Sequence, residues 1–140
     1  MKMKRIVLLL SASLLLLAGC GTGKQEKEAG TYRQISQEKA QRIMEREEGY
    51  VIVDVRREDE FVSGHIPGAI LIPNESIEDT PPAQLPDRDQ LILIYCRSGN
   101  RSKQAAQKLA DMGYANIYEF GGIIDWTGEV VTTQQETDGS

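Results

Sequence analysis

The sequence has few of the residues that bind metals or form disulfide bonds. Its 140 residues contain two cysteines and a single histidine. There is no zinc-type pair of cysteines, no nucleotide-binding glycine fingerprint and no internal repeat. We therefore expect neither a metal site nor a bound cofactor, and the chain has to perform any chemistry with its own side chains.

Basic residues are also too few to balance the acidic ones. The chain has 16 Lys and Arg against 21 Asp and Glu, a net charge of −5. Removal of residues 1–19 would take away Lys2, Lys4 and Arg5 and no acidic residue, so the net charge would become −8. A chain this acidic is a poor nucleic-acid binder and is not drawn to anionic lipid head groups. We expect no nucleic-acid partner, and we expect membrane attachment only through lipid.

Long apolar runs are scarce, and the longest lies close to the start of the chain. Residues 6–17 are apolar or small, and they follow a positively charged segment, residues 1–5. The run is too short for a comfortable membrane span, which needs about 20 apolar residues. This order of charge and hydrophobicity is typical of a signal peptide.

The residues after this run are Leu17-Ala18-Gly19-Cys20, which resemble the lipobox of bacterial lipoproteins. The resemblance implies a signal peptide over residues 1–19 and a lipid anchor on Cys20; the alternative is an ordinary secretory signal with an incidental cysteine. Residues 20–31 are small and charged and are predicted to be a flexible tether. Either alternative places the folded part outside the cytoplasm, and the lipobox places it at the membrane of the cell envelope.

Residues 32–127 have the pattern of one α/β domain. Apolar runs typical of buried strands alternate with segments of helical periodicity. Strands are predicted near residue 35 and at 50–55, 70–72, 91–95 and 117–120, and helices at 36–47, with Ser36 as the N-cap, 56–63 and 101–112. This alternation favours a parallel sheet of about five strands with helices on both faces. Hydrophobicity collapses after that, so residues 128–140 are predicted to be a disordered tail.

Cys96 lies between the apolar run Leu91–Tyr95 and a predicted helix. In open α/β sheets, ligands bind beyond the carboxyl ends of the strands. Backbone N–H groups of such a loop can point at one anion, and the helix adds partial positive charge. Arg97 and Arg101 add permanent charges, and Gly99 allows a tight or left-handed backbone. We therefore expect Cys96 to ionise easily, and the thiolate is the nucleophilic form.

Cys96 has no partner for a disulfide bond if Cys20 carries lipid. An unpaired thiol in an oxidising compartment invites oxidation, so its presence is easier to understand if the chemistry uses it. The alternative is a small buried hydrophobic residue at a strand end, which the very polar loop after it argues against.

Several short motifs, in their order and spacing, resemble the rhodanese family. They are Asp54-Val55-Arg56, Glu60-Phe61, the GHIPGA turn at 64–69, the YCRSGNRS loop at 95–102, and Gly121-Gly122 with Trp126. The resemblance implies that Cys96 accepts a sulfane sulfur as a persulfide and passes it to cyanide, a thiol or a protein. It also implies that the loop binds a small anionic donor such as thiosulfate through Arg97, Ser98, Gly99, Asn100 and Arg101.

Two alternatives stay open beside a sulfurtransferase. One is a phosphatase or arsenate reductase, but the loop has four residues between Cys96 and Arg101. That number matches sulfurtransferases, whereas the related phosphatases have five, because a phosphoryl group needs a wider cradle. The other alternative is a non-catalytic rhodanese module that delivers or senses sulfur or binds a partner. Such a module does not need a thiolate at neutral pH.

Three further residues are candidates for supporting the site. His65 is the single histidine, and a Cys–His pair can activate a thiol; in a Gly-His-Ile-Pro-Gly turn, however, an imidazole more often bonds to backbone groups. Asp54 ends a strand on the active face, and Arg56 follows it. The alternative for Asp54 and Arg56 is a set of structural polar contacts that fix neighbouring loops, with Glu60 as a partner.

Overall fold

The structure is a computed structural model that describes residues 30–139. The predicted signal peptide, Cys20 and nearly all of the predicted tether lie outside the described residues. No helix within residues 30–139 combines the length and the apolar character that crossing a membrane requires.

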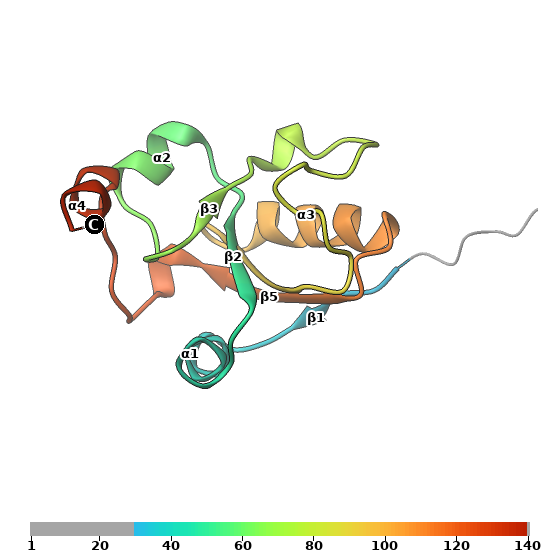
Figure 1. Cartoon of the computed structure of the whole chain (residues 1–140), viewed down its shortest axis with the longest axis horizontal. Helices are drawn as coiled ribbons and strands as arrows, with labels where there is room; N and C mark the ends of the chain where they lie inside the picture. Colours follow the sequence, from blue (N-terminus) through green and yellow to red (C-terminus); the bar gives the residue numbers. More distant parts are fainter. Residues whose placement is uncertain (1–29, 140) are drawn as a thin grey trace, which may run out of the picture.

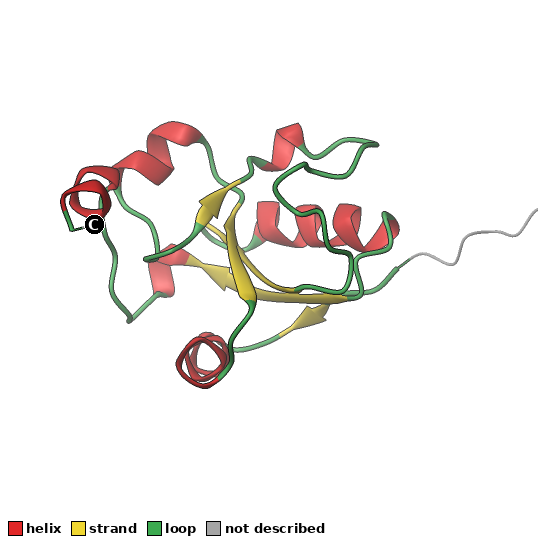
Figure 2. Cartoon of the chain, viewed as in Figure 1, coloured by secondary structure: helices red, strands yellow, loops and turns green. Residues whose placement is uncertain are grey.

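Five parallel strands form one sheet in the order β1-β5-β4-β2-β3 (Figures 1 and 2). The strands are β1 (Arg33–Gln34), β2 (Tyr50–Asp54), β3 (Ile70–Leu71), β4 (Leu91–Cys96) and β5 (Asn116–Gly122). The central strand β4 pairs with β2 and β5 and is buried from Ile92 to Cys96, as its unbroken apolar sequence predicts. The expected α/β fold with a five-stranded parallel sheet is confirmed.

Helices cover both faces of the sheet. They are α1 (Gln37–Arg46), α2 (Glu58–Ser63), α3 (Asn100–Asp111) and α4 (Thr133–Asp138), with 3-10 turns η1 (Asn74–Ser76) and η2 (Ile123–Asp125). Figure 1 shows α1 and α3 on opposite sides of the sheet. The helix α1 begins after Ser36, whose side chain accepts a hydrogen bond from the Lys39 N–H. This is the N-cap that the sequence predicted.

The pleat of β4 decides which way Cys96 faces. Alternate residues of a strand point to opposite faces. Ile92 and Ile94 belong to the apolar cluster under α3, whereas Leu93 and Tyr95 belong to the cluster on the α1 side. Cys96 continues the first row and therefore faces α3. Two packed cores thus hold the end of β4 from both sides.

The C-terminal residues differ from the disordered tail predicted over 128–140. Val131 forms an antiparallel bridge with His65, with both N–H···O distances at 2.9 Å. The helix α4 follows and begins with a capping box between Thr132 and Gln135; it packs beside α2 (Figure 1). The prediction was wrong here because these backbone hydrogen bonds order a segment whose composition is poor in apolar residues.

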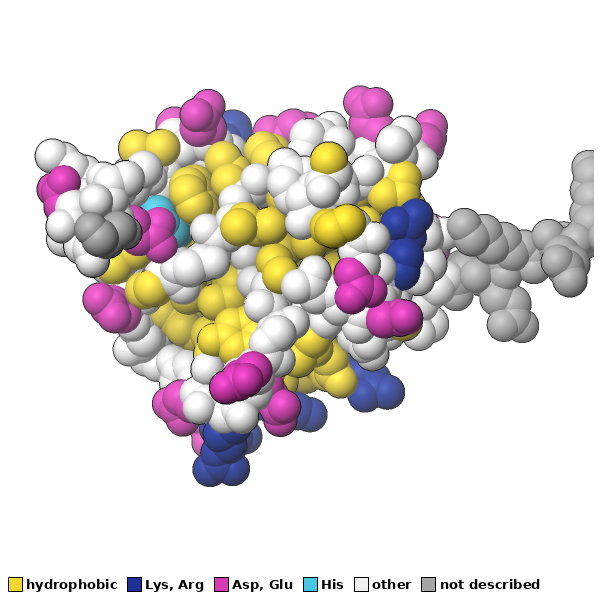
Figure 3. All heavy atoms as spheres, in the orientation of Figure 1, with side chains coloured by type: hydrophobic (Ala, Val, Ile, Leu, Met, Phe, Trp, Pro, Cys, Tyr) yellow, Lys and Arg dark blue, Asp and Glu magenta, His cyan; other side chains and the backbone are white. Residues whose placement is uncertain are grey.

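Charged side chains are distributed unevenly over the surface drawn in Figure 3. Acidic side chains occur at several places around the rim, and Lys and Arg occur in separate groups at the edges. A long polyanion would meet no continuous basic stripe on this face.

Candidate active site

The loop between β4 and α3 places one backbone N–H directly on the sulfur of Cys96. Cys96 is the last residue of β4 and is 1% exposed. Gly99, the N-cap of α3, has φ +103°, a conformation that favours glycine. Its N–H donates to Cys96 Sγ at 3.0 Å. The sharp turn that Gly99 allows therefore aims a donor at the thiol.

Hydrogen bonds to the sulfur outweigh the effect of burial on its ionisation. Burial alone would raise the pKa of Cys96. Interactions with the Ser102 side chain and with the backbone of Ser102, Gly99 and Ser98 act in the opposite direction, and they hold the pKa of Cys96 below its ordinary value. This direction agrees with the expected easily ionised thiol.

The two adjacent glycines at the end of β5 let that strand approach the loop. A side chain on Gly122 would begin 2.0 Å from the Arg97 carbonyl oxygen and 2.6 Å from Ser98 Cα, far inside contact distance. The Ile124 N–H donates to the same Arg97 carbonyl at 3.2 Å. Gly121 has φ +92°. The Gly-Gly motif thus supports the loop from outside.

Arg101 forms a two-pronged ion pair with Glu60 of α2. Its Nη1 donates to Oε2 at 2.7 Å and its Nη2 to Oε1 at 2.9 Å. The hydrogen bond with Arg101 lowers the pKa of Glu60 to about 2, although partial burial opposes the shift. Arg101 also interacts electrostatically with Cys96. Glu60 was expected beside Asp54 and Arg56, but the structure pairs it with Arg101 instead.

The other predicted loop residues form the outer rim. The side chains of Arg97, Ser98 and Asn100 are exposed. A cavity of about 300 Å³ lies beside the loop, and its lining includes Ser98, Gly99 and residues of β5 and α3. The rim therefore offers polar groups to solvent while the sulfur lies beneath it.

Asp54 and Arg56 bind each other rather than the loop. Arg56 donates from Nε to both Asp54 oxygens, at 3.0 and 3.1 Å, and from Nη2 to Oδ2 at 2.7 Å. The same Nη2 donates to the Gly64 carbonyl at 2.6 Å. Asp54 is 0% and Arg56 5% exposed. The geometry matches the alternative that the sequence left open, a structural contact that ties β2 to the turn at Gly64.

His65 has both ring nitrogens engaged away from Cys96. Nδ1 lies 2.8 Å from the Phe61 carbonyl oxygen and Nε2 lies 2.9 Å from Glu136 Oε2. The ring stacks on Phe61 at a centroid distance of 3.8 Å. His65 therefore has no free nitrogen for the thiol, and its contacts hold α4 against the domain.

Two buried residues next to Cys96 were missed as site residues. Cys96 Sγ lies 3.4 Å from Ser102 Oγ, and Ser102 Oγ lies 2.6 Å from Glu119 Oε1. Ser102 is 0% and Glu119 2% exposed. The signal in the sequence was Glu119 itself, a charged residue inside an apolar strand. It is two residues after the core residue Ile117, so its side chain points to the same face of the sheet.

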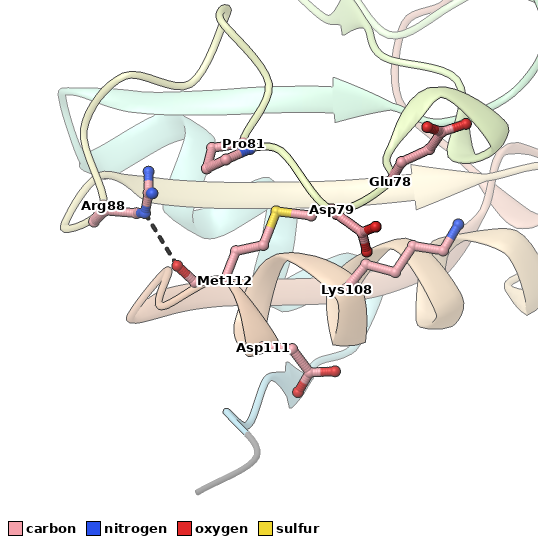
Figure 4. A pocket seen from close by; sticks show the side chains of 7 residues that line it. All are labelled: Glu78, Asp79, Pro81, Arg88, Lys108, Asp111 and Met112. Carbon is pink, nitrogen blue, oxygen red and sulfur yellow. Dashed lines mark hydrogen bonds between the residues drawn. The ribbon is translucent and has the colours of Figure 1, made fainter. Parts of the chain in front are cut away.

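A second cavity, of about 410 Å³, lies at the other end of α3 (Figure 4). Its basic side chains already have partners: Arg88 Nε donates to the Met112 carbonyl, and Lys108 Nζ donates to Asn74. Acidic Glu78, Asp79 and Asp111 share the lining. This mixture of charges gives no site for an anionic donor.

Comparison with known proteins gives consistent matches. The family model "Rhodanese-like domain" matches residues 36–129. Thiosulfate sulfurtransferase GlpE of Pseudomonas syringae pv. syringae is 36% identical over 107 residues, covering 76% of this chain and 94% of that protein. Thiosulfate sulfurtransferase PspE of Escherichia coli is 33% identical over 73 residues, 52% and 70% of the two chains. The putative sulfur carrier protein YrkF of Bacillus subtilis is 31% identical over 110 residues, 78% and 58% of the two chains.

Solved structures match over the same region. A rhodanese with anions from E. coli has 30% identity and a TM-score of 0.55, and the match covers 59% of this chain and 98% of that one. A rhodanese-related protein from Thermoplasma volcanium has 28% identity and a TM-score of 0.61, with 71% and 98% covered.

Proposed function

The chain belongs to the rhodanese-like domain family, and on that premise we propose that it is a sulfurtransferase whose nucleophile is Cys96. The observation that carries the proposal is the Gly99 N–H at 3.0 Å from Cys96 Sγ. Together with the neighbouring donors it lowers the pKa of the thiol despite burial. The similarity to thiosulfate sulfurtransferases at 33% and 36% identity supports the same chemistry.

The proposed reaction has two balanced steps. The Cys96 thiolate attacks the outer sulfur of thiosulfate, an S–S bond forms to Cys96, and the S–S bond of the donor breaks to release sulfite. The persulfide then gives its outer sulfur to a nucleophile: with cyanide the products are thiocyanate and the Cys96 thiolate. The loop N–H groups stabilise negative charge on sulfur in both steps.

We propose that the donor is a small anion that meets Arg101. Cys96 is 1% exposed, so a donor must displace side chains at the rim before its sulfur reaches Sγ. The Arg101 side chain is 29% exposed, and its present partner Glu60 is a carboxylate. A sulfur oxyanion can replace that carboxylate on the same guanidinium edge. Exposed Arg97, Ser98 and Asn100 then complete the donor site.

The acceptor is proposed to be cyanide, a thiol or a protein. A protein acceptor has indirect support from the similarity to the putative sulfur carrier protein YrkF, which spans 78% of this chain. The exposed polar rim of the loop is where such a partner would receive the sulfur.

A sulfur-loading experiment on the full chain in detergent tests the activity. The wild type treated with thiosulfate should gain the mass of one sulfur atom, localised to Cys96, and should then form thiocyanate from cyanide. Cys96→Ala should lose both, whereas the matched variant Cys20→Ser should keep both, because it removes the other cysteine only. A folded wild type that takes up no sulfur would refute the proposal.

Two other results would favour the alternatives. Sulfur uptake without transfer to any small acceptor would favour a non-catalytic module for sulfur delivery or sensing. Hydrolysis of an aryl phosphate that depends on Cys96 would favour a phosphatase.

We also propose that lipid on Cys20 anchors the protein to a membrane of the cell envelope, with the domain outside the cytoplasm. The support is the Leu-Ala-Gly-Cys sequence at 17–20 after the apolar run. In cells fed a labelled fatty acid, the wild-type protein should become labelled and the Cys20→Ser variant should not. A wild type that stays unlabelled and fractionates with soluble proteins would refute the anchor.

A further inference from the structure

Glu119 is a buried carboxylate one hydroxyl group away from the nucleophile. It lies in β5 and is 2% exposed. Its Oε1 accepts a hydrogen bond from the Gly121 N–H at 2.8 Å and lies 2.6 Å from Ser102 Oγ. The Gly121 N–H and the Ser102 hydroxyl, which are its hydrogen-bond partners among residues 30–139, are both neutral groups. A buried carboxylate without a cation carries a high desolvation cost unless it holds a proton or serves the site.

The Ser102 hydroxyl has one hydrogen and several neighbours that could accept it. Its oxygen lies 2.6 Å from Glu119 Oε1, 3.0 Å from the Gly99 carbonyl oxygen and 3.4 Å from Cys96 Sγ. If Glu119 is ionised, it takes this hydrogen, and Ser102 Oγ then accepts from the Cys96 thiol. If Cys96 is ionised, Ser102 donates to Sγ and accepts from protonated Glu119.

Besides the Ser102 hydrogen, both arrangements contain one proton, on Cys96 or on Glu119, and one negative charge. A second negative charge in the same buried cluster would be unfavourable, because like charges at short range in a low-dielectric interior repel strongly. We propose that Glu119 is a positioning residue that shares a single proton with Cys96 through the Ser102 hydroxyl. This inference deepens the proposed function and rests on it for the use of the thiolate.

The proton transfer is balanced within the three side chains. The S–H bond of Cys96 breaks and its hydrogen bonds to Ser102 Oγ, while the Ser102 hydrogen moves to Glu119. The products are a Cys96 thiolate and a neutral Glu119, so no charge enters or leaves the cluster. When a persulfide forms, the negative charge moves to the outer sulfur, and Glu119 keeps its proton until the thiolate returns.

Other charged groups surround the cluster and set its pH dependence. Arg101 of α3 interacts with Cys96 and is itself paired with Glu60 of α2. On the other side, Lys103 of α3 and Asp125 of η2 line the same cavity as Glu119. These groups change the pH at which Cys96 and Glu119 lose their protons, but they do not make the two ionisations depend on each other.

The pH profile of Cys96 alkylation tests the inference on the full chain. Two coupled groups titrate in two macroscopic steps. The wild-type alkylation rate should therefore rise in two steps as pH increases. The lower step comes from molecules in which Cys96 is a thiolate and Glu119 holds the remaining proton. Glu119→Gln removes the carboxylate, so its profile should have one step, at least about one pH unit below the upper wild-type step.

Matched variants separate the proton-sharing role from a packing role. Ser102→Ala should lose the lower step, because the thiolate loses the hydroxyl that stabilises it beside a neutral Glu119. Asp125→Asn, which alters a carboxylate on the same cavity, should keep both steps. A one-step wild-type profile that coincides with that of Glu119→Gln would overturn the inference.

Infrared difference spectroscopy of the wild type gives an answer even if Glu119→Gln fails to fold. As pH rises through the lower step, the Cys96 S–H band should be partly lost while part of the protonated carboxyl band persists, because one proton is then divided between the two groups. A protonated carboxyl band that disappears completely before the S–H band begins to fall contradicts proton sharing. Neither measurement needs sulfur transfer, so an inactive protein with coupled titration would refute the proposed function and not this inference.

Discussion

Two arginine–carboxylate pairs lie near the carboxyl ends of the strands, and they differ in burial. Asp54 and Arg56 have side chains that are 0% and 7% exposed. Glu60 and Arg101 are 17% and 29% exposed. Both pairs are linked by more than one hydrogen bond, so the chemistry of the contact is the same. The difference in exposure indicates which pair can change partners.

The buried pair has further bonds that fix it. Arg56 also binds the Gly64 carbonyl, and its guanidinium lies 5.8 Å from the centroid of the Tyr95 ring. Breaking such a pair leaves an uncompensated buried charge. Arg101 can instead exchange Glu60 for a ligand while water screens both groups. One pair therefore holds the fold, and the other suits a binding rim.

The largest expected effect comes from breaking the buried pair. Asp54→Ala should lower the free energy of unfolding by about 3–5 kcal/mol, because Arg56 stays buried without a counter-charge. Chemical denaturation measures the loss. The double variant Asp54→Asn with Arg56→Met removes both charges and should recover most of the stability. A loss below about 1 kcal/mol in Asp54→Ala would show that this pair is no more structural than a surface pair.

The sequence predicted features that local pattern decides. The apolar run Leu91–Tyr95 indicated a buried central strand, and the residues after it indicated a turn that places Cys96 between a strand and a helix. Both depend on neighbours in the chain, so they could be read from residue order. The N-cap at Ser36 is a third case, because a cap and its partner are three residues apart.

The partners of charged side chains could not be predicted in the same way. Glu60 and Arg101 are 41 residues apart and meet only because the fold brings α2 within side-chain reach of Arg101. Glu119 was visible as a charge in an apolar strand, but its link to Ser102 depends on α3 packing over β5. The helix α4 was recognisable from its capping box between Thr132 and Gln135, a signal that the polar composition obscured.

The next largest effect is on catalysis, from the exposed pair. Arg101→Ala should lower kcat/KM for thiosulfate about 10- to 100-fold, since a charge-assisted hydrogen bond contributes roughly 1.5–3 kcal/mol. Its free energy of unfolding should fall by less than that of Asp54→Ala, because the Arg101–Glu60 pair is partly exposed. Arg42→Ala, on the outer face of α1, should leave kcat/KM unchanged. If Arg101→Ala destabilised the fold as much as Asp54→Ala, the contrast between the two pairs would be lost.

A smaller effect of opposite sign is expected from Glu60. Glu60→Gln frees the Arg101 guanidinium and should lower KM for thiosulfate a few-fold, with a stability loss at pH 7 that is smaller than that of Asp54→Ala. The pKa of Glu60 is lowered from 4.5 to about 2 in the fold. Its stabilising effect is therefore present above pH 4.5 and lost as pH falls toward 2. Denaturation curves of the wild type and Glu60→Gln should converge over that range; a constant difference would exclude the ion pair as its cause.

The smallest effect concerns Glu136, whose carboxylate is 37% exposed while its partner His65 is 0% exposed. Hydrogen bonds from the Gly68 N–H and from His65 lower the pKa of Glu136, so its stabilising effect is present above its ordinary pKa and lost as pH falls through the lowered value.

Because one side of this contact is open to water, Glu136→Gln should cost less than about 0.5 kcal/mol globally. The local effect should be larger: amide hydrogen exchange over residues 131–138 should speed up, because α4 depends on few apolar contacts. Gln134→Ala on the same helix should leave that exchange unchanged. If Glu136→Gln instead destabilised the whole domain as strongly as Asp54→Ala, burial of both partners would not explain why a pair contributes strongly to the stability of the fold.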